Sequence, residues 1–168
     1  MTEDITAPDG FDQLTAMRAA GRRAPMGETM NFHMVEVDRG HVVFEGTPDR
    51  GVYNPMGSVH GGYAATLLDS ACGIAVHSRL AAGHGYTTLE LKIAYHRGLS
   101  ERSGPVRAVG RVASIGRRVA FAEATLHDSA GRLCASATST LLVFELQDKP
   151  LSPNSPTAPA PNERMHTS

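Results

Sequence analysis

Hydrophobic and polar residues follow one another along this chain in patterns that predict two helices and six strands. Residues 11–21 have the composition of a short helix, with Asp9 as a possible cap and Gly21 as its stop. Residues 31–38 and 41–47 are strand-like and are separated by an Arg-Gly pair, which predicts a hairpin. Further strands are predicted at residues 86–96, 106–115, 118–127 and 133–146.

The longest predicted helix covers residues 61–80, an Ala- and Leu-rich segment with turn-forming residues only at its ends. This helix is apolar on nearly all sides, so we expect it to be buried. A buried helix needs a sheet that covers it, and the strands predicted after it suit antiparallel pairing. The pattern therefore predicts an α+β fold in which a curled antiparallel sheet wraps around one long central helix.

The strand predicted at residues 86–96 alternates in a way that assigns its residues to two faces. Leu89, Leu91, Ile93 and Tyr95 fall on one face. Thr88 falls on the opposite face, together with the charged residues of the strand. We therefore expect these four side chains and Thr88 to point in opposite directions.

The ends of the chain differ in composition from the segment between them. Residues 1–10 are acidic and polar, and we expect them to be flexible. Residues 148–168 are rich in Pro, Ser, Thr and Asn and cannot bury enough apolar surface to fold, so we expect a disordered tail. One folded domain is therefore predicted over residues 11–147.

Composition and charge narrow the function classes. Hydrophobic residues make up 41% of the chain and charged residues 20%, with a net charge of −1 and scattered basic residues, so nucleic acid is not expected as a partner. No apolar run approaches the roughly 18 residues of a membrane span, and no membrane partner is expected. Only Cys72 and Cys134 are present, without metal-ligand spacing, and the first ten residues lack the apolar core of a signal peptide. We therefore expect a reducing, cytoplasmic compartment.

The sequence His60-Gly61-Gly62 stands where a loop is predicted to become the long helix. The first amides of a helix have no partner inside the helix and carry the positive end of its dipole. Glycine lets a ligand come close to these amides, which suits a carbonyl oxygen that gains negative charge during acyl transfer. A simple glycine-rich helix start without a ligand gives the same pattern, so both interpretations stay open here.

Asp69 is a carboxylate inside the most apolar helix of the chain. A buried carboxylate is costly unless it is paired or catalytic, so either a structural or a catalytic role fits. Asp69 lies eight residues after Gly61, which is about 12 Å along a helix that rises 1.5 Å per residue. If both residues act on one carbonyl, two identical helices must run antiparallel across a two-fold axis, which predicts a homodimer with shared sites.

The spacing of these residues resembles that of a known family, the hot-dog-fold thioesterases of the phenylacetate-pathway (PaaI) type and of the 4-hydroxybenzoyl-CoA type. The resemblance covers residues 32–144 in the order of elements, and its specific part runs from residue 54 to residue 69. It implies a hot-dog fold and acyl-CoA thioesterase activity, without a metal or an organic cofactor. The matching positions are Asn54, Gly57, His60, Gly61, Gly62, Asp69 and Thr88.

The resemblance implies a catalytic role for five of these residues, the fifth of which is Thr88. Asp69 would activate water as a base or attack the thioester itself, and Gly61 would supply the oxyanion amide. Asn54 would position the water or the carboxylate, or bond the thioester carbonyl. His60 would form a hydrogen bond near the thioester and orient the loop.

Thr88 and three positions expected to bind substrate or CoA complete the site. Thr88 would orient the water through its hydroxyl, with Thr87 as the alternative, because the alignment is ambiguous around residues 83–85. Gly62 would allow the substrate to approach, and Arg117 and Arg118 would meet the phosphates of CoA, although a solvated hairpin tip explains the arginines equally well. The histidines of the chain lack metal-ligand spacing. Candidates to line the acyl pocket are Tyr63, Met56 and Phe121.

Together these observations predict an enzyme that hydrolyses an aryl or medium-chain acyl-CoA to the free acid and CoA. We expect a homodimer or homotetramer with sites shared between subunits. Two alternatives stay open: a non-catalytic acyl-CoA-binding protein that uses the same pocket, and a hot-dog enoyl-CoA hydratase. The Asp69 carboxylate argues against the first, and the missing Asp/His or His/Glu pairing argues against the second.

Overall fold

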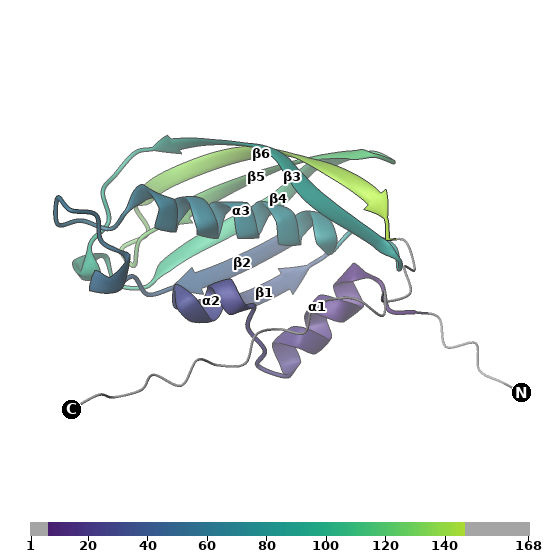
Figure 1. Cartoon of the computed structure of the whole chain (residues 1–168), viewed down its shortest axis with the longest axis horizontal. Helices are drawn as coiled ribbons and strands as arrows, with labels where there is room; N and C mark the ends of the chain where they lie inside the picture. The colour runs from purple at the N-terminus through teal and green to yellow at the C-terminus, as the bar shows by residue number, and fades with distance from the viewer. Residues whose placement is uncertain (1–6, 147–168) are drawn as a thin grey trace, which may run out of the picture.

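A curled six-stranded antiparallel sheet holds one long helix, α3, against its concave face (Figure 1). The computed structural model describes residues 7–146, and the strand order is β1-β2-β4-β5-β6-β3. This arrangement confirms the predicted α+β architecture. The elements are α1 (Gly10–Ala19), α2 (Pro25–Thr29), β1 (Phe32–Asp38), β2 (His41–Gly46), α3 (Gly61–His77), β3 (His84–Tyr95), β4 (Val106–Ile115), β5 (Val119–His127) and β6 (Leu133–Glu145), with short 3-10 turns at Arg50–Val52 and Glu101–Ser103.

Helix α3 packs against the sheet through side chains that are almost fully buried. Leu67 and Leu68 have no exposed surface, and each contributes roughly 1.5–3 kcal/mol through burial of its apolar side chain. The approach is close at Gly110 of β4, because a Cβ atom there would lie 2.2 Å from the carbonyl oxygen of Ala71. The helix ends at His77, three residues before the predicted end.

A β-bulge changes the face assignment that the sequence predicts for β3. Thr88 pairs with Leu141 and Glu90 pairs with Thr140, so Leu89 is an extra residue without its own partner. The bulge shifts the alternation by one, and Leu89 is 60% exposed. Thr88 therefore lies on the same, helix-facing side as Leu91, and the predicted opposition between the two is wrong.

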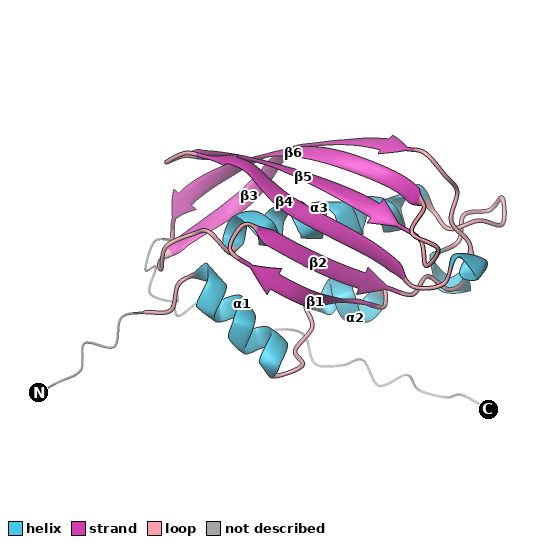
Figure 2. Ribbon diagram, turned by 180° about the vertical axis from the view of Figure 1, so that it is seen from behind, coloured by secondary structure: helices cyan, strands magenta, loops and turns pink. Residues whose placement is uncertain are grey.

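The two edges of the sheet differ in what lies beside them. Helix α1 and the short helix α2 lie beside β1 (Figure 2). The sequence pattern predicted α1 but not α2. Arg18 donates a hydrogen bond from Nε to the backbone oxygen of Val35 over 2.9 Å, which occupies part of that edge. In contrast, the 12-residue strand β3 forms the other edge, and it pairs only with β6 within the described residues.

Helix α1 begins one residue earlier than the sequence pattern predicts. Asp9 accepts a hydrogen bond from the Asp12 amide and caps α1, as predicted, and Gly10 already belongs to the helix. The rest of the predicted flexible start (residues 1–6) and the predicted tail (residues 148–168) lie outside the described residues. Within residues 7–146, every helix is too short or too polar to cross a membrane.

Candidate active site

His60 closes the loop that leads into α3 and caps the helix. Its Nδ1 atom accepts a hydrogen bond from the Gly62 amide over 2.9 Å, and its backbone oxygen accepts one from the Tyr63 amide, also over 2.9 Å. Because a backbone amide can only donate, Nδ1 is unprotonated and the neutral ring carries its hydrogen on Nε2. The His60 amide in turn bonds the Val52 oxygen over 2.8 Å, which ties the cap to the preceding 3-10 turn.

The Gly61 amide is the free donor of this helix start. The amides of Gly62 and Tyr63 are both occupied by His60, whereas the first residue of a helix has no internal acceptor for its N–H. No acceptor for the Gly61 N–H is found among residues 7–146. The helix dipole adds partial positive charge at this point, so the amide is suited to bind an oxyanion.

Asp69 and Thr88 are brought together between α3 and β3. The Thr88 hydroxyl donates a hydrogen bond to Oδ1 of Asp69 over 3.0 Å, and both residues are half-buried. The bulge at Leu89 is what turns Thr88 toward the helix. Thr87, the alternative considered from the sequence, is exposed and points to the other face. The geometry thus favours Thr88 as the hydroxyl beside the carboxylate.

The Asp69 carboxylate influences two buried neighbours. Burial, and after it the negative charge of Asp69, raises the pKa of Tyr86 to about 12. Burial raises the pKa of the Cys72 thiol to about 12 as well, with smaller contributions from Asp69 and Glu123. A thiol with such a pKa is a poor nucleophile at neutral pH, so Cys72 belongs to the core.

Asn54 is engaged in its own turn. Its Oδ1 accepts from the amides of Met56 (3.0 Å) and Ser58 (3.2 Å), and its Nδ2 donates to the Ser58 hydroxyl over 3.0 Å. Asn54 therefore shapes the loop before His60. Within the described part of a single chain it contacts neither Gly61 nor Asp69 through a hydrogen bond.

The predicted CoA-binding arginines lie at the exposed tip between β4 and β5. The Arg118 oxygen accepts from the Val143 amide over 2.9 Å, and Val143 pairs with Tyr86 near the start of β3. Tyr95, at the other end of β3, is the residue that bonds Gly61. Arg117 and Arg118 thus lie at the opposite end of the protomer from Gly61.

The three residues suggested for the acyl pocket lie in different parts of the protomer. Tyr63 is 1% exposed and belongs to the core, and its hydroxyl has no hydrogen-bond partner within residues 7–146. Met56 is 85% exposed on its loop. Phe121 has the outward register of β5, on the side of the sheet away from α3, where it is 49% exposed. Alternation alone did not show which face of each element is covered.

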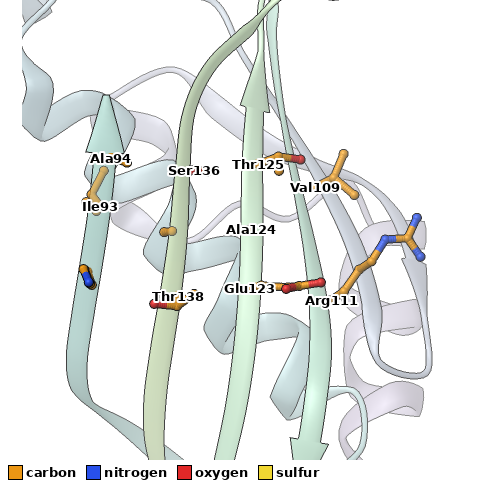
Figure 3. A pocket seen from close by; sticks show the side chains of 11 residues that line it. Ile93, Ala94, Val109, Arg111, Glu123, Ala124, Thr125, Ser136 and Thr138 are labelled. Carbon is orange, nitrogen blue, oxygen red and sulfur yellow. The ribbon is translucent and has the colours of Figure 1, made fainter. Parts of the chain in front are cut away.

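A small cavity of about 250 Å³ lies beside the start of α3. It is lined by residues from the end of β3, the following loop and the start of α3. A larger hollow of about 490 Å³ lies on the outer face of the sheet, among Lys92, Arg111 and Glu123 (Figure 3). We place the chemistry at the smaller cavity, because Gly61 borders it and the larger one contains neither Gly61 nor Asp69. The small cavity is lined by Val59, His60, Gly61, Ala64, Tyr95, His96, Arg97, Gly98, Leu99, Cys134 and Ala135.

Tyr95 is a residue of this region that the sequence pattern did not single out. Its hydroxyl donates a hydrogen bond to the Gly61 carbonyl oxygen over 3.0 Å. Nothing in a one-dimensional pattern pairs residue 95 with residue 61, because the contact depends on the register of β3. Among residues 7–146, no group of three or more His, Cys, Asp or Glu residues is arranged to hold a metal ion.

The chain is similar to known thioesterases in sequence and in structure. A family model described as "Thioesterase superfamily" matches residues 56–135. The proofreading thioesterase EntH of Cronobacter turicensis is 28% identical over 96 residues, which are 57% of this chain and 69% of that protein.

Two solved structures are also similar. One is a putative thioesterase of Ralstonia eutropha described as related to phenylacetic acid degradation (TM-score 0.69, 26% identity, 77% of this chain and 98% of that one). The other is a hypothetical thioesterase of Streptococcus pneumoniae with coenzyme A (TM-score 0.63, 26% identity, 70% of this chain and 91% of that one). The fold, the family match and these relatives identify the chain as a thioester hydrolase with the hot-dog fold.

Proposed function

We propose that this hydrolase cleaves an acyl-CoA thioester to the free acid and CoA. The observation that carries the proposal is the pairing of two features on α3. The Gly61 amide is a free donor at the positive end of the helix, and the Asp69 carboxylate is held by Thr88. The similarity to a streptococcal thioesterase with coenzyme A supports CoA as the thiol part of the substrate.

In the proposed mechanism, water or Asp69 attacks the thioester carbonyl carbon. In the first case the carboxylate takes a proton from the attacking water, and in the second it forms an anhydride that water then hydrolyses. The carbonyl oxygen gains negative charge against the Gly61 amide, and the Nε2–H of His60 is a second donor near it. The carbon–sulfur bond then breaks, and the thiolate of CoA leaves without a dedicated general acid.

Thr88 and Asn54 have supporting roles in this proposal. The Thr88 hydroxyl occupies Oδ1 of Asp69, which leaves Oδ2 for the water or the substrate. Asn54 holds the loop that presents His60, through the two amides that its Oδ1 accepts. The role of Asn54 in this protomer is thus to support the loop, and any direct contact with water or thioester has to come from the assembled site.

We propose a homodimer that shares two sites. Gly61 and Asp69 are about 12 Å apart along α3, too far to act on one carbonyl within a subunit. The uncovered edge of β3 is long enough to pair with a second copy, which would set the two α3 helices antiparallel. The side of α3 that is not covered by the sheet is only half-buried and carries small or polar residues: Gly62, Ala65, Thr66, Asp69 and Ser70.

A homotetramer of two such dimers completes the proposed assembly. Exposed apolar side chains outside β3, among them Phe121, remain on the protomer after β3 pairs. They would provide the second contact. In the dimer, Arg117 and Arg118 at one end of a subunit would lie near Gly61 and Gly62 of the partner. This supports their proposed role at the CoA phosphates.

The cavity beside Gly61 supports an aryl or medium-chain acyl group. Its volume of about 250 Å³ exceeds that of a single ring and is too small for a long, folded chain. Val59, Leu99 and Ala64 give it apolar walls. The relative described as related to phenylacetic acid degradation favours the PaaI-type branch and an aryl group. A cytoplasmic location stays a prediction from the two unpaired, buried cysteines.

Release of free thiol from phenylacetyl-, hydroxybenzoyl- and straight-chain acyl-CoAs tests the proposal. We expect wild type to turn over the aryl substrates best and Asp69→Asn to lose about 10²–10⁴-fold in kcat. Asp38→Asn, which changes an exposed aspartate at the end of β1, is the matched control and should keep full activity. Binding of acyl-CoA without turnover by wild type would instead favour a non-catalytic binding protein, and hydration of an enoyl-CoA would favour a hydratase.

A further inference from the structure

Tyr95 holds the peptide group next to the free Gly61 amide. Its hydroxyl donates to the Gly61 carbonyl oxygen over 3.0 Å. Its ring lies directly against the same residue, because a Cβ atom at Gly61 would be 3.2 Å from Cζ and Oη of Tyr95. The side chain is 56% exposed, so burial in the protomer core does not explain its position.

The peptide between Gly61 and Gly62 is fixed at both of its polar atoms. Tyr95 donates to its oxygen, and His60 Nδ1 accepts from its N–H over 2.9 Å. Two consecutive glycines are otherwise the least restrained backbone that a sequence can place at a helix start. The Gly61 N–H belongs to the preceding peptide, and the two peptides share the Gly61 Cα atom. A displacement of the Gly61–Gly62 peptide would move this Cα atom and thereby shift the Gly61 N–H. The two hydrogen bonds oppose that displacement from opposite sides.

The register of β3 couples this contact to the carboxylate. Thr88 and Tyr95 are seven residues apart, and in a regular strand an odd separation places side chains on opposite faces. The bulge at Leu89 removes that opposition. One irregularity therefore directs Thr88 toward Asp69 and Tyr95 toward Gly61, so both halves of the site are supported from the same strand.

We propose that Tyr95 is a positioning residue for the oxyanion site, an inference that rests on the proposed thioesterase function. Its hydroxyl fixes the Gly61–Gly62 peptide and with it the Gly61 Cα atom, which keeps the Gly61 N–H aimed at the thioester oxygen. The bond to that oxygen strengthens as charge develops in the transition state. Loss of the hydroxyl consequently lowers kcat and leaves KM nearly unchanged.

The test compares Tyr95→Phe with Tyr53→Phe. Tyr53 is a suitable control because its hydroxyl also bonds the backbone, accepting from the Glu101 amide over 2.8 Å, and does not touch Gly61. We expect Tyr95→Phe to lower kcat about tenfold with KM within about twofold, and Tyr53→Phe to keep wild-type kcat. Circular dichroism and thermal melting check that both variants fold as wild type does.

A vibrational measurement separates positioning from a general loss of structure. Phenylacetyl-CoA with a ¹³C-labelled carbonyl is bound to Asp69→Asn, which holds the thioester without hydrolysing it. Isotope-edited infrared spectra should show a carbonyl stretch lowered by the Gly61 amide. In Asp69→Asn/Tyr95→Phe the band should move back toward its position in free substrate, and in Asp69→Asn/Tyr53→Phe it should stay.

The outcomes distinguish this inference from the function on which it rests. Unchanged kcat and an unchanged carbonyl band in the Tyr95→Phe variants, with active wild type, would overturn the role of Tyr95 alone. A lower kcat without a band shift would also overturn it, because the loss would then not act through the oxyanion site. Wild type without activity on any thioester would overturn the proposed function instead.

Discussion

The two sides of helix α3 have opposite chemical properties. The side against the sheet carries large apolar residues, and Leu67, Leu68 and Val76 have no exposed surface. The other side carries small or polar residues, including Ala65 and Asp69, which are half-buried. The inner side is thus occupied by packing within the subunit. The outer side keeps a carboxylate accessible and carries small side chains.

Asp69 and Cys72 show this difference within one turn of helix. Asp69 is half-buried and accepts a hydrogen bond from Thr88, so its charged form has a partner and access to solvent. Cys72 is completely buried, and burial raises the pKa of its thiol to about 12. The thiol on the inner side is therefore unreactive at neutral pH, whereas the carboxylate on the outer side can be reached from solvent.

The largest expected effect comes from combining two inactive variants on this helix. Gly61→Pro removes the amide hydrogen, and His60 already has the extended backbone that must precede proline (φ −62°, ψ 137°). We expect Gly61→Pro and Asp69→Asn each to lose about 10²–10⁴-fold in kcat. Co-expressed chains should form mixed dimers with one intact site, which restores about a quarter of wild-type activity.

A control isolates the amide in this experiment. Gly61→Ala introduces nearly the same contact with the Tyr95 ring but keeps the N–H, so it should lose less activity than Gly61→Pro. If the mixed sample remains as inactive as the two separate variants, Gly61 and Asp69 do not meet across subunits. The shared site, and with it the proposed meaning of the outer side of α3, would then be wrong.

The sequence predicted the elements of the fold more completely than their faces. The apolar segment from Gly61 gave α3 because propensity and burial agree there, and the strands followed from alternation and glycine turns. The bulge at Leu89 could not be predicted, because it depends on the pairing of β3 with β6. That bulge decides where Thr88 and Tyr95 point.

The long-range contacts of the candidate site could not be predicted from local sequence patterns either. Gly61 and Asp69 could be singled out from the sequence because a glycine pair starts the helix and a carboxylate lies inside an apolar segment. Asn54 forms three hydrogen bonds within its own turn, and its expected role toward the water or the thioester stays a prediction. Tyr95 joins Gly61 from 34 residues away. Such contacts are set by tertiary register, which a local pattern does not contain.

A bulky charge on the outer side of α3 should prevent assembly. Ala65 is half-buried there, so Ala65→Arg can be accommodated in the free subunit but would separate two antiparallel helices. We expect the variant to sediment as a monomer and to lose at least about tenfold in kcat, because the shared site is not formed. Ala20→Arg, at the exposed end of α1, should change neither sedimentation nor activity. A fully active Ala65→Arg monomer would contradict the shared site.

On the inner side of α3 the expected effects are smaller and concern stability. Cys72→Ala removes a fully buried sulfur atom, and we expect the free energy of unfolding to fall by about 1–2 kcal/mol, with unchanged kcat. In native wild type at pH 8 only about 10⁻⁴ of this thiol is ionised, so Ellman's reagent should modify it far more slowly than in the denatured chain. Rapid modification of Cys72 with loss of activity would show that the inner side is accessible.

The stabilisation of the folded chain by Cys72 should depend on pH. The pKa of the Cys72 thiol rises from 9.0 to about 12 on folding, so above pH 9 the unfolded chain loses a proton that the folded chain keeps. The stabilisation by Cys72 is therefore complete below pH 9 and decreases as pH rises toward 12. Denaturant unfolding of wild type and Cys72→Ala at pH 8 and pH 10 should show their difference shrink by about 1 kcal/mol. A constant difference would mean that solvent reaches the thiol in the folded protein, and the contrast with the outer side would be lost.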